Sequence, residues 1–456
     1  MNPQMNVMKF LNENVCPATG CTEPVAVGYA TAIAYQVLHG NFQVSDAGIL
    51  FPSTAPIVDI DEVRSIEIKT DRDVYKNALA VAIPGTNGQK GMAIASAMGL
   101  YSSPAMGLNL FSGISEESVR NANEVLRQGK VSIQKVTDAA PTARLDIEVL
   151  LAYGNGHPKE TYVRLSDKHD HIRTISVNDK VIYEGTDITS ASGQGTAFPN
   201  TIEEMVAIVK GMNGNERAAV YRGIEMNLAM AKTGLSTEYG LRSGRTLQKL
   251  VDEGTLNLDL VTKVRIAAAG AGDARMGGAD MPVMSTAGSG NQGITALIPI
   301  AITGEHIGAN KDRIAEAALL SHLVTKYASL SSGYLSAICG CTIKAGIGAA
   351  AGVAYLLGGD NEQIGAAINL MSANLTGVVC DGAKEGCSLK LSTAAGTATE
   401  SALMAISGVR VPSDNGIVFA NGEDTIKGIG RIAHSMVTTD LTIVELMQSK
   451  PKQGGQ

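Results

Sequence analysis

Tryptophan is absent from the 456-residue sequence, and aromatic residues make up only 4% of it. A core without large rings must be built from Ala, Val, Ile, Leu and Met, with backbones packed closely where the 51 glycines permit it. Charged residues are also scarce, at 18%, whereas hydrophobic residues reach 45%, which excludes disorder for most of the chain. The net charge of −7 offers no basic field for a polyanion, so we do not expect nucleic acid as a partner.

Long apolar runs are missing as well. The N-terminus has no basic segment followed by an apolar stretch, so it does not resemble a secretory signal. The Ala/Gly run at 345–357 is shorter than the ~20 apolar residues needed to span a bilayer. We therefore expect no membrane partner and a small-molecule function in the cytoplasm. The length is sufficient for two or three domains.

The first two hundred residues alternate between helical and extended patterns. Helices are predicted at 3–14, 24–39, 89–100 and 115–127. Apolar and β-branched residues with a period of two predict strands at 62–70, 130–137, 145–153, 160–166, 171–177 and 180–184. This pattern indicates an α+β domain, residues 1–198, with a mostly antiparallel sheet.

Strand patterns almost disappear after residue 200. Helices are predicted at 201–210, 214–233, 241–253, 257–269, 310–330, 334–357, 360–374 and 389–406. The Ser-, Thr- and Gly-rich segment 186–199 reads as a linker. We therefore predict an all-helical domain, residues 199–456, whose glycine-rich helices must be held by close tertiary packing, because each Gly costs about 1 kcal/mol relative to Ala.

The six cysteines are too few for a disulfide scaffold, and their spacing suggests a shared site. Two occur near the N-terminus and four beyond residue 338: Cys16, Cys21, Cys339, Cys341, Cys380 and Cys387. The paired C-x2-C knuckles of structural zinc are absent. Thiolates from two segments could instead hold an iron–sulfur cluster with one open iron, a Lewis acid. Buried free cysteines are also common in Ala-rich cores, and the spacing alone leaves both interpretations open.

The N-terminal segment Cys21-Thr22-Glu23 precedes a predicted helix. The positive end of a helix dipole lowers the pKa of a nearby thiol, so Cys21 could act as a thiolate with Glu23 beside it. An ordinary helix cap next to a buried cysteine is the alternative. The turn at 169–171 (His-Asp-His) is interpreted as solvated, and Lys390 is the one lysine near these cysteines that draws attention.

Two further segments are suited to carboxylate binding. The glycine-rich loop 285–293 precedes a helix, and Ser289, Asn291 and Gln292 could add side-chain contacts to its backbone N–H groups. Arg275 is expected in a glycine-flanked loop, where its guanidinium could clamp a carboxylate or pair with Asp273. The loop 285–293 does not match a nucleotide-binding fingerprint, and a plain turn is its alternative interpretation.

The ordered set of motifs resembles a known family across nearly the whole chain. The motifs are PATGCTEP at 17–24, KNALAVAIPGTNGQKG at 76–91, AAAGAGDARMGG at 267–278, STAGSGNQGITALIP at 285–299, AICGCTIKAGIGAAAG at 337–352 and VVCDGAKEGCSLKLSTAAGTA at 378–398. They are similar to those of the L-cysteine desulfidase family, which is related to the alpha chain of the iron–sulfur L-serine dehydratases. The resemblance implies a 4Fe–4S enzyme that degrades L-cysteine to pyruvate, ammonia and sulfide without pyridoxal phosphate.

The resemblance also implies roles for individual residues. The cluster ligands fall on Cys341, Cys380 and Cys387, with Cys341 preferred to Cys339 because Cys339 has a Gly counterpart in the related dehydratases. Cys21 is implied either as a fourth ligand or as a base, with Glu23 in the catalytic set. We expect an amino acid substrate and a homo-oligomer. L-serine as the substrate, or a non-catalytic metal-binding protein of the same fold, are the alternatives.

Overall fold

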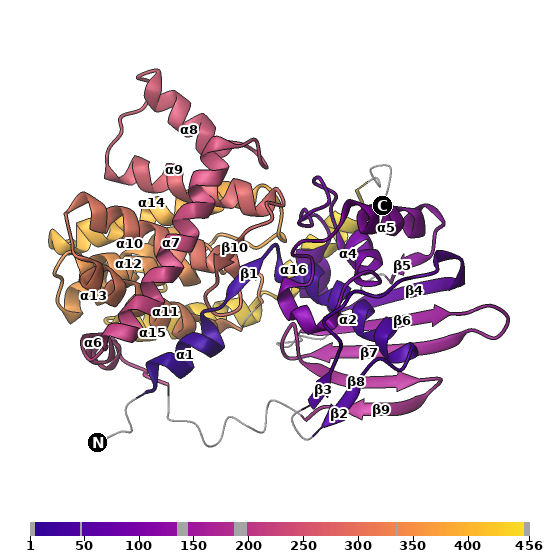
Figure 1. Cartoon of the computed structure of the whole chain (residues 1–456). Coiled ribbons are helices and arrows are strands. Elements are labelled where there is room, and N and C mark those ends of the chain that lie inside the picture. The colour runs from indigo at the N-terminus through magenta and orange to yellow at the C-terminus, as the bar shows by residue number, and fades with distance from the viewer. Residues whose placement is uncertain (1–4, 46–47, 135–144, 187–197, 334, 451–456) are drawn as a thin grey trace.

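The computed structural model describes residues 5–45, 48–134, 145–186, 198–333 and 335–450, which form two lobes side by side (Figure 1). The first lobe contains a six-stranded sheet in the order β5-β4-β6-β7-β8-β9. Only the β4–β5 pair is parallel. The strands are β4 (Val63–Thr70), β5 (Val131–Ile133), β6 (Asp146–Tyr153), β7 (Lys159–Ser166), β8 (Ile172–Val177) and β9 (Lys180–Glu184). The predicted α+β region with a mostly antiparallel sheet is confirmed.

One face of this sheet is covered by α2 (Thr22–Leu38), which is buried at every position except the last. A helix that is apolar all round must be enclosed, and α2 lies against β6 and β7, with its Ile33 in the same core cluster as Ile147 of β6 and Val163 of β7. The remaining elements of this lobe are short: β2 (Gln43–Ser45), β3 (Gly48–Leu50), η1 (Ile60–Glu62), α3 (Arg72–Ala78), α4 (Met92–Gly99), η2 (Pro104–Asn109) and α5 (Glu116–Arg127).

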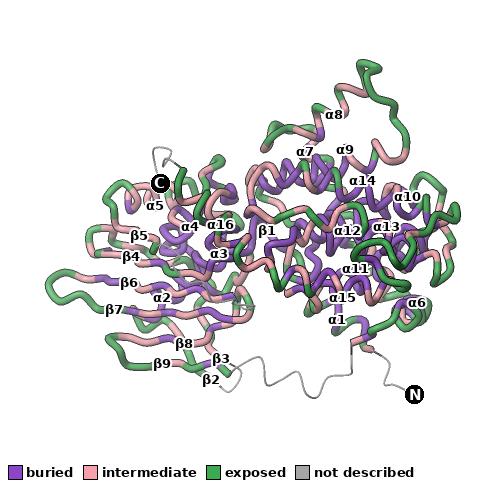
Figure 2. The backbone as a smooth tube through the Cα atoms, turned by 180° about the vertical axis from the view of Figure 1, so that it is seen from behind, coloured by how far each residue is buried: buried purple, intermediate pink, exposed green. Residues whose placement is uncertain are grey.

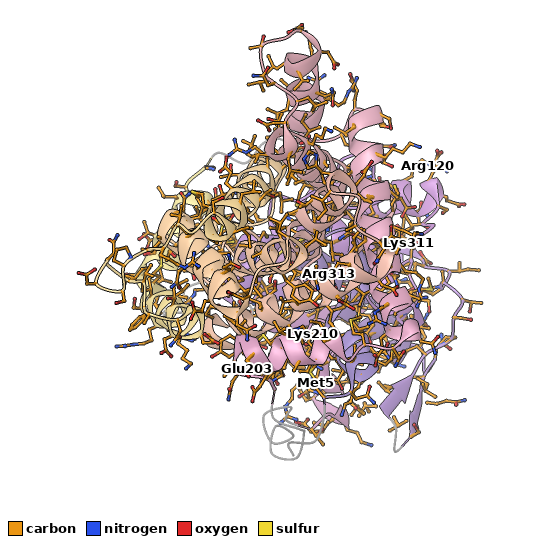
Figure 3. The ribbon with its side chains drawn as sticks, turned by 90° about the vertical axis from the view of Figure 1, so that its left-hand side faces the viewer. Met5, Arg120, Glu203, Lys210, Lys311 and Arg313 are labelled. Atoms are coloured by element: carbon orange, nitrogen blue, oxygen red, sulfur yellow. The ribbon has the colours of Figure 1, made fainter. Side chains whose placement is uncertain are left out.

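The second lobe is helical, as predicted. Its helices are α6 (Ile202–Lys210), α7 (Gly214–Ser236), α8 (Ser243–Asp252), α9 (Leu260–Met276), α10 (Gly290–His306), α11 (Lys311–Ser332), α12 (Lys344–Leu356), α13 (Asn361–Leu375), α14 (Cys387–Ile406) and α15 (Gly422–Ser435). Figure 2 shows a buried core along α10, α12 and α14. Figure 3 looks onto the outer end of this lobe, where charged side chains such as Lys210 and Lys311 face solvent. Among the described helices, none is both long and apolar enough to cross a membrane.

Glycines allow the helices of this lobe to approach closely. A Cβ on Gly234 of α7 would lie 1.8 Å from the carbonyl oxygen of Gly270 in α9, and one on Gly272 would lie 2.8 Å from Cα of Ser388 in α14. Because of this packing, α9 continues to Met276 instead of ending at 269 as predicted. Arg275 therefore lies in the last turn of a helix and not in a loop, which corrects our expectation.

A second predicted boundary is also wrong. The helix expected at 334–357 begins only at Lys344, because the preceding residues pair with another loop through an Ile338–Val379 bridge. Parts of three other predicted segments lie outside the described residues: 3–4 of the first helix, 135–137 of the second strand and 187–197 of the linker.

The two ends of the chain each pack on the lobe formed by the opposite half of the sequence. α1 (Val7–Asn14) contributes Phe10 and Leu11 to the core of the helical lobe, while α16 (Val437–Gln448) contributes Val444 to the core of the sheet lobe. A short strand after α1, β1 (Pro17–Thr19), pairs with β10 (Pro282–Met284) of the helical lobe. We propose that the boundary near residue 198 separates the lobes apart from these exchanged ends.

Candidate functional site

A cavity of about 80 Å³ gathers residues from both halves of the chain. Every residue proposed from the sequence for catalysis, substrate binding or metal binding lines it: Cys21, Glu23, Arg275, Ser289, Asn291, Gln292, Cys341, Cys380 and Cys387. A larger cavity of about 480 Å³ adjoins it and shares Thr22, His169, Gly288 and Leu335 with it. The two cavities are therefore neighbours that meet at these four residues.

Backbone pairing brings the C-terminal cysteines together. Cys339 N donates to Val378 O (2.9 Å), and Cys380 N donates to Ala337 O (2.7 Å), so two loops that are about forty residues apart run antiparallel. The loop from Cys380 then leads into α14, whose first residue is Cys387. Four thiols thus reach one cavity from two loops and one helix start.

Burial and a hydrogen bond between two of these thiols shift their pKa values. Burial raises the pKa of Cys387 to about 11 and also raises that of Cys380. The Cys341 thiol donates a hydrogen bond to Cys339, which lowers the pKa of Cys339 to about 6 and raises that of Cys341 well above its usual value.

The N-terminal loop places a thiol and a carboxylate on the same cavity. Cys21 is the N-cap of α2, and its Sγ donates to Glu23 Oε2 at 2.9 Å. Burial and the charge of Glu23 raise the pKa of Cys21 well above its usual value, although the Arg275 guanidinium opposes this shift. The expected lowering of this pKa by the helix dipole is thus wrong. Cys21 packs in one apolar cluster with Cys387.

Arg275 links two parts of the site. Its Nη1 donates to Asn291 Oδ1 (2.7 Å), and its Nη2 donates to the carbonyl of Gly20 (2.6 Å). The guanidinium therefore ties the N-terminal loop to α10, and its two terminal nitrogens bind protein groups. The alternative pairing with Asp273 is not formed, because Asp273 accepts bonds from Ser243 Oγ and Gly244 N.

The start of α10 faces the cavity. Ser289 is its N-cap, and the Ser289 hydroxyl accepts a bond from Gln292 N at 3.4 Å. Asn291 and Gln292 in the first turn are almost fully buried and line the cavity. Unpaired N–H groups and the positive end of a helix dipole favour a carboxylate at such a position.

Sequence reasoning missed two residues of the cavity. Lys344, only 1% exposed, lines it at the start of α12, and burial lowers its pKa to about 8. His169 lies in the predicted turn, but its ring lines both cavities and burial lowers its pKa. A lysine three residues after Cys341 was the one available signal for the first. Lys390 also lines the cavity, and its Nζ lies 2.5 Å from Asp381 Oδ1.

The four cysteine thiols of the cavity are the kind of ligand that soft metals prefer, but they are not arranged to hold a single metal ion. Within the described residues, no three Cys, His, Asp or Glu side chains lie close enough together to hold one metal ion. Four thiols nevertheless surround one cavity, and thiolates are the ligands that iron–sulfur clusters use. A cluster is several ångström wide, so its ligands stand farther apart than those of one ion. The chemistry of this donor set, four thiols on one cavity, therefore suits an iron–sulfur cluster.

The protein therefore combines an α+β lobe, a glycine-rich helical lobe and a cavity lined by thiols. These three features define its class. Residues 106–445 match the family described as the serine dehydratase alpha chain. The chain belongs to this family.

Relatives cover nearly the whole chain. The UPF0597 protein of Desulfotalea psychrophila is 34% identical over 99% of this chain and 100% of its own length. The UPF0597 protein of Alkaliphilus oremlandii is 35% identical over 97% and 98%, respectively. That of Clostridioides difficile is 36% identical over 98% and 100%. The similarity therefore extends across both lobes.

Proposed function

We propose that this protein is a 4Fe–4S-dependent carbon–sulfur lyase that converts L-cysteine into pyruvate, ammonia and sulfide without pyridoxal phosphate. The observation that carries the proposal is the meeting of thiols, a thiol–carboxylate pair and a helix N-terminus around one cavity. Membership of the serine dehydratase alpha chain family supports a β-elimination, because L-cysteine differs from L-serine only in its β-substituent. A cytoplasmic location suits a site that depends on free thiols.

Cys341, Cys380 and Cys387 would hold the cluster. When bound, the cluster supplies an iron with an open coordination position, a Lewis acid that stabilises negative charge on a leaving group. Cys339 hydrogen-bonds with Cys341, and we assign it to the support of that ligand.

The remaining groups bind substrate and move a proton. We assign the α-carboxylate of the substrate to the N-terminus of α10, with Ser289, Asn291 and Gln292 as partners. Glu23 accepts the Cys21 proton along their 2.9 Å hydrogen bond, and the resulting thiolate removes the α-proton of the substrate. Loss of sulfide then gives aminoacrylate, which hydrolyses to pyruvate and ammonia.

The test is an anaerobic assay of reconstituted protein with L-cysteine and with L-serine as separate substrates. We expect L-cysteine to yield sulfide and pyruvate in equal amounts. The rate of their release should be proportional to the iron and inorganic sulfide bound by the protein. Cys380→Ala protein is the matched control for release that does not depend on the site. Stoichiometric zinc, no iron–sulfur chromophore and no product would instead indicate a non-catalytic metal-binding protein.

L-serine dehydration is the second candidate function, and the family match favours it. A pocket that accepts a β-thiol differs only slightly from one that accepts a β-hydroxyl. Pyruvate from L-serine without sulfide from L-cysteine would establish this second function and overturn the first.

A further inference from the structure

Four charged side chains form a buried group where the C-terminal helix meets the sheet lobe. Lys76 Nζ of α3 lies 2.5 Å from Asp440 Oδ1 of α16 and 3.2 Å from Asp73 Oδ1. Arg72 Nε lies 3.8 Å from Asp440 Oδ2. The Lys76 side chain is 1% exposed and that of Asp440 is 3% exposed. Two cations and two anions leave the group neutral.

This charged group touches the loop that carries two of the proposed cluster ligands. A Cβ on Gly382 would lie only 2.1 Å from the backbone oxygen of Lys76, so the loop presses directly on α3. Asn77, the next residue, accepts a hydrogen bond from Cys380 Sγ at 3.9 Å. The carboxylates of Asp73 and Asp440, 3.2 Å and 2.5 Å from Lys76 Nζ, keep this side chain in its ammonium form. The ammonium of Lys76 therefore belongs to a group of charges that packs against the loop carrying Cys380.

We propose that Lys76 and Asp440 are positioning residues that set the charge around the cluster ligand Cys380. Lys76 stabilises the Cys380 thiolate, and Asp440 limits that stabilisation and holds Lys76 in place. A buried thiolate is costly unless a cation lies nearby, and the interaction is strong in an interior of low dielectric. The proposal rests on the proposed function in one respect, namely that Cys380 is a ligand.

The arrangement predicts opposite effects for the two residues. Lys76→Met leaves the carboxylates of Asp73 and Asp440 beside the thiolate and makes the group negative by one charge. Asp440→Asn leaves the ammonium less compensated and makes the group positive by one charge. A negative charge near a cluster disfavours its reduction and weakens its hold on the ligand, whereas a positive charge does the reverse.

The experiment uses the full-length protein, reconstituted anaerobically with iron and sulfide. We expect Lys76→Met to move the reduction potential of the cluster to a more negative value and to speed its loss to a chelator about tenfold or more. We expect Asp440→Asn to move the potential to a more positive value, and the double variant to return close to the wild-type potential. Lys69→Met is the matched control, because Lys69 pairs with Glu148 on the exposed side of β4.

A purely structural role for these residues would give a different result. It would lower the unfolding temperature of the variants without shifting their potentials in opposite directions. Under our proposal, Lys76→Arg keeps the charge and therefore the wild-type potential. Unshifted potentials in cluster-loaded Lys76→Met and Asp440→Asn proteins overturn this inference. Asp440→Asn decides the matter if Lys76→Met does not fold. Wild-type protein that takes up no cluster would instead overturn the proposed function.

Discussion

Single residues of this site divide into those that motifs reveal and those that only packing reveals. Cys380, Cys387 and Asn291 lie in distinctive sequence motifs, so their chemistry is visible in the sequence. The roles of Lys344 and Lys76 are not visible in the sequence, because a lysine becomes a site residue only when the fold buries it. Their burial results from contacts between segments that lie far apart in the chain. Electrostatic partners of a site are therefore harder to predict than its ligands.

The proposed roles of two cysteines predict different phenotypes. Cys380→Ala removes a cluster ligand, so we expect bound iron and lyase activity to fall together. Cys21→Ala leaves the three ligands in place but removes the base, so we expect most of the iron to remain while turnover falls at least about a hundredfold. Iron analysis and sulfide release on the same samples measure both. Cys16→Ala is the control, because Cys16 is exposed and lines only the larger cavity, away from the other thiols.

A full-activity Cys21→Ala protein would contradict the role assigned to the thiolate. Loss of iron in that variant would instead indicate that Cys21 is a fourth ligand.

Asn291→Ala should affect binding and not the metal. A hydrogen bond to a charged group contributes about 1.5–3 kcal/mol, so we expect KM to rise about tenfold or more with iron content unchanged. Asn227→Ala is the matched control, because this buried asparagine holds the backbone of Met284 and does not line the cavity. An unchanged KM in Asn291→Ala protein would remove this residue from the substrate site.

His322 predicts how stability depends on pH. It is fully buried, bonds Thr286 Oγ1 through Nδ1 at 2.8 Å, and burial lowers its pKa from 6.5 to about 3. Below pH 6.5 the unfolded chain binds a proton that the folded chain refuses, so the free energy of unfolding falls as the pH drops toward 3. We expect His322→Gln to reduce the loss between pH 7 and pH 5 by about 2 kcal/mol, measured by urea unfolding. The exposed His157→Gln should leave that difference unchanged.

Among the elements, periodicity predicts type better than boundaries. The strands β6 to β9 match the predicted segments within one residue, because alternation along a half-buried strand is a local property. The starts and ends of α9 and α12 depend on contacts between helices and loops that the local sequence does not contain. Glycine explains part of the difference, since it weakens an isolated helix but permits close packing in a folded one.

Two glycines of α7 test this account. Gly234→Ala would place a Cβ against the backbone of Gly270, so we expect a loss of about 1–3 kcal/mol in the free energy of unfolding. Gly214→Ala lies in the same helix with no atom within 4 Å of the added Cβ, so it should be neutral or stabilising by up to about 1 kcal/mol. Denaturant unfolding of both variants measures the contrast. Equal changes in the free energy of unfolding for the two variants would show that the close contact with α9 is not the reason for a glycine at position 234.

At the scale of the whole molecule, the exchanged ends make the two lobes interdependent. α1 packs on the helical lobe and α16 on the sheet lobe, so each lobe includes a segment from the far end of the chain. Local patterns predict both lobes, but they carry no information about contacts between residues separated by most of the sequence. The exchange also explains how the loop after α1 reaches α10, because β1 pairs with β10 and holds the loop there.

Phe10→Ala tests this interdependence. Phe10 is 5% exposed and packs in the core of the helical lobe, with its ring 6.0 Å from that of Phe198. Truncation of a buried phenylalanine costs about 3–5 kcal/mol. We therefore expect faster amide hydrogen exchange in α6 and α7, about two hundred residues away in the sequence, with little change in the sheet that follows α1 more closely. Met8→Ala on the exposed side of the same helix should change neither region. Faster exchange in β4–β9 and not in α6 and α7 would show that α1 stabilises the lobe nearest to it in the sequence.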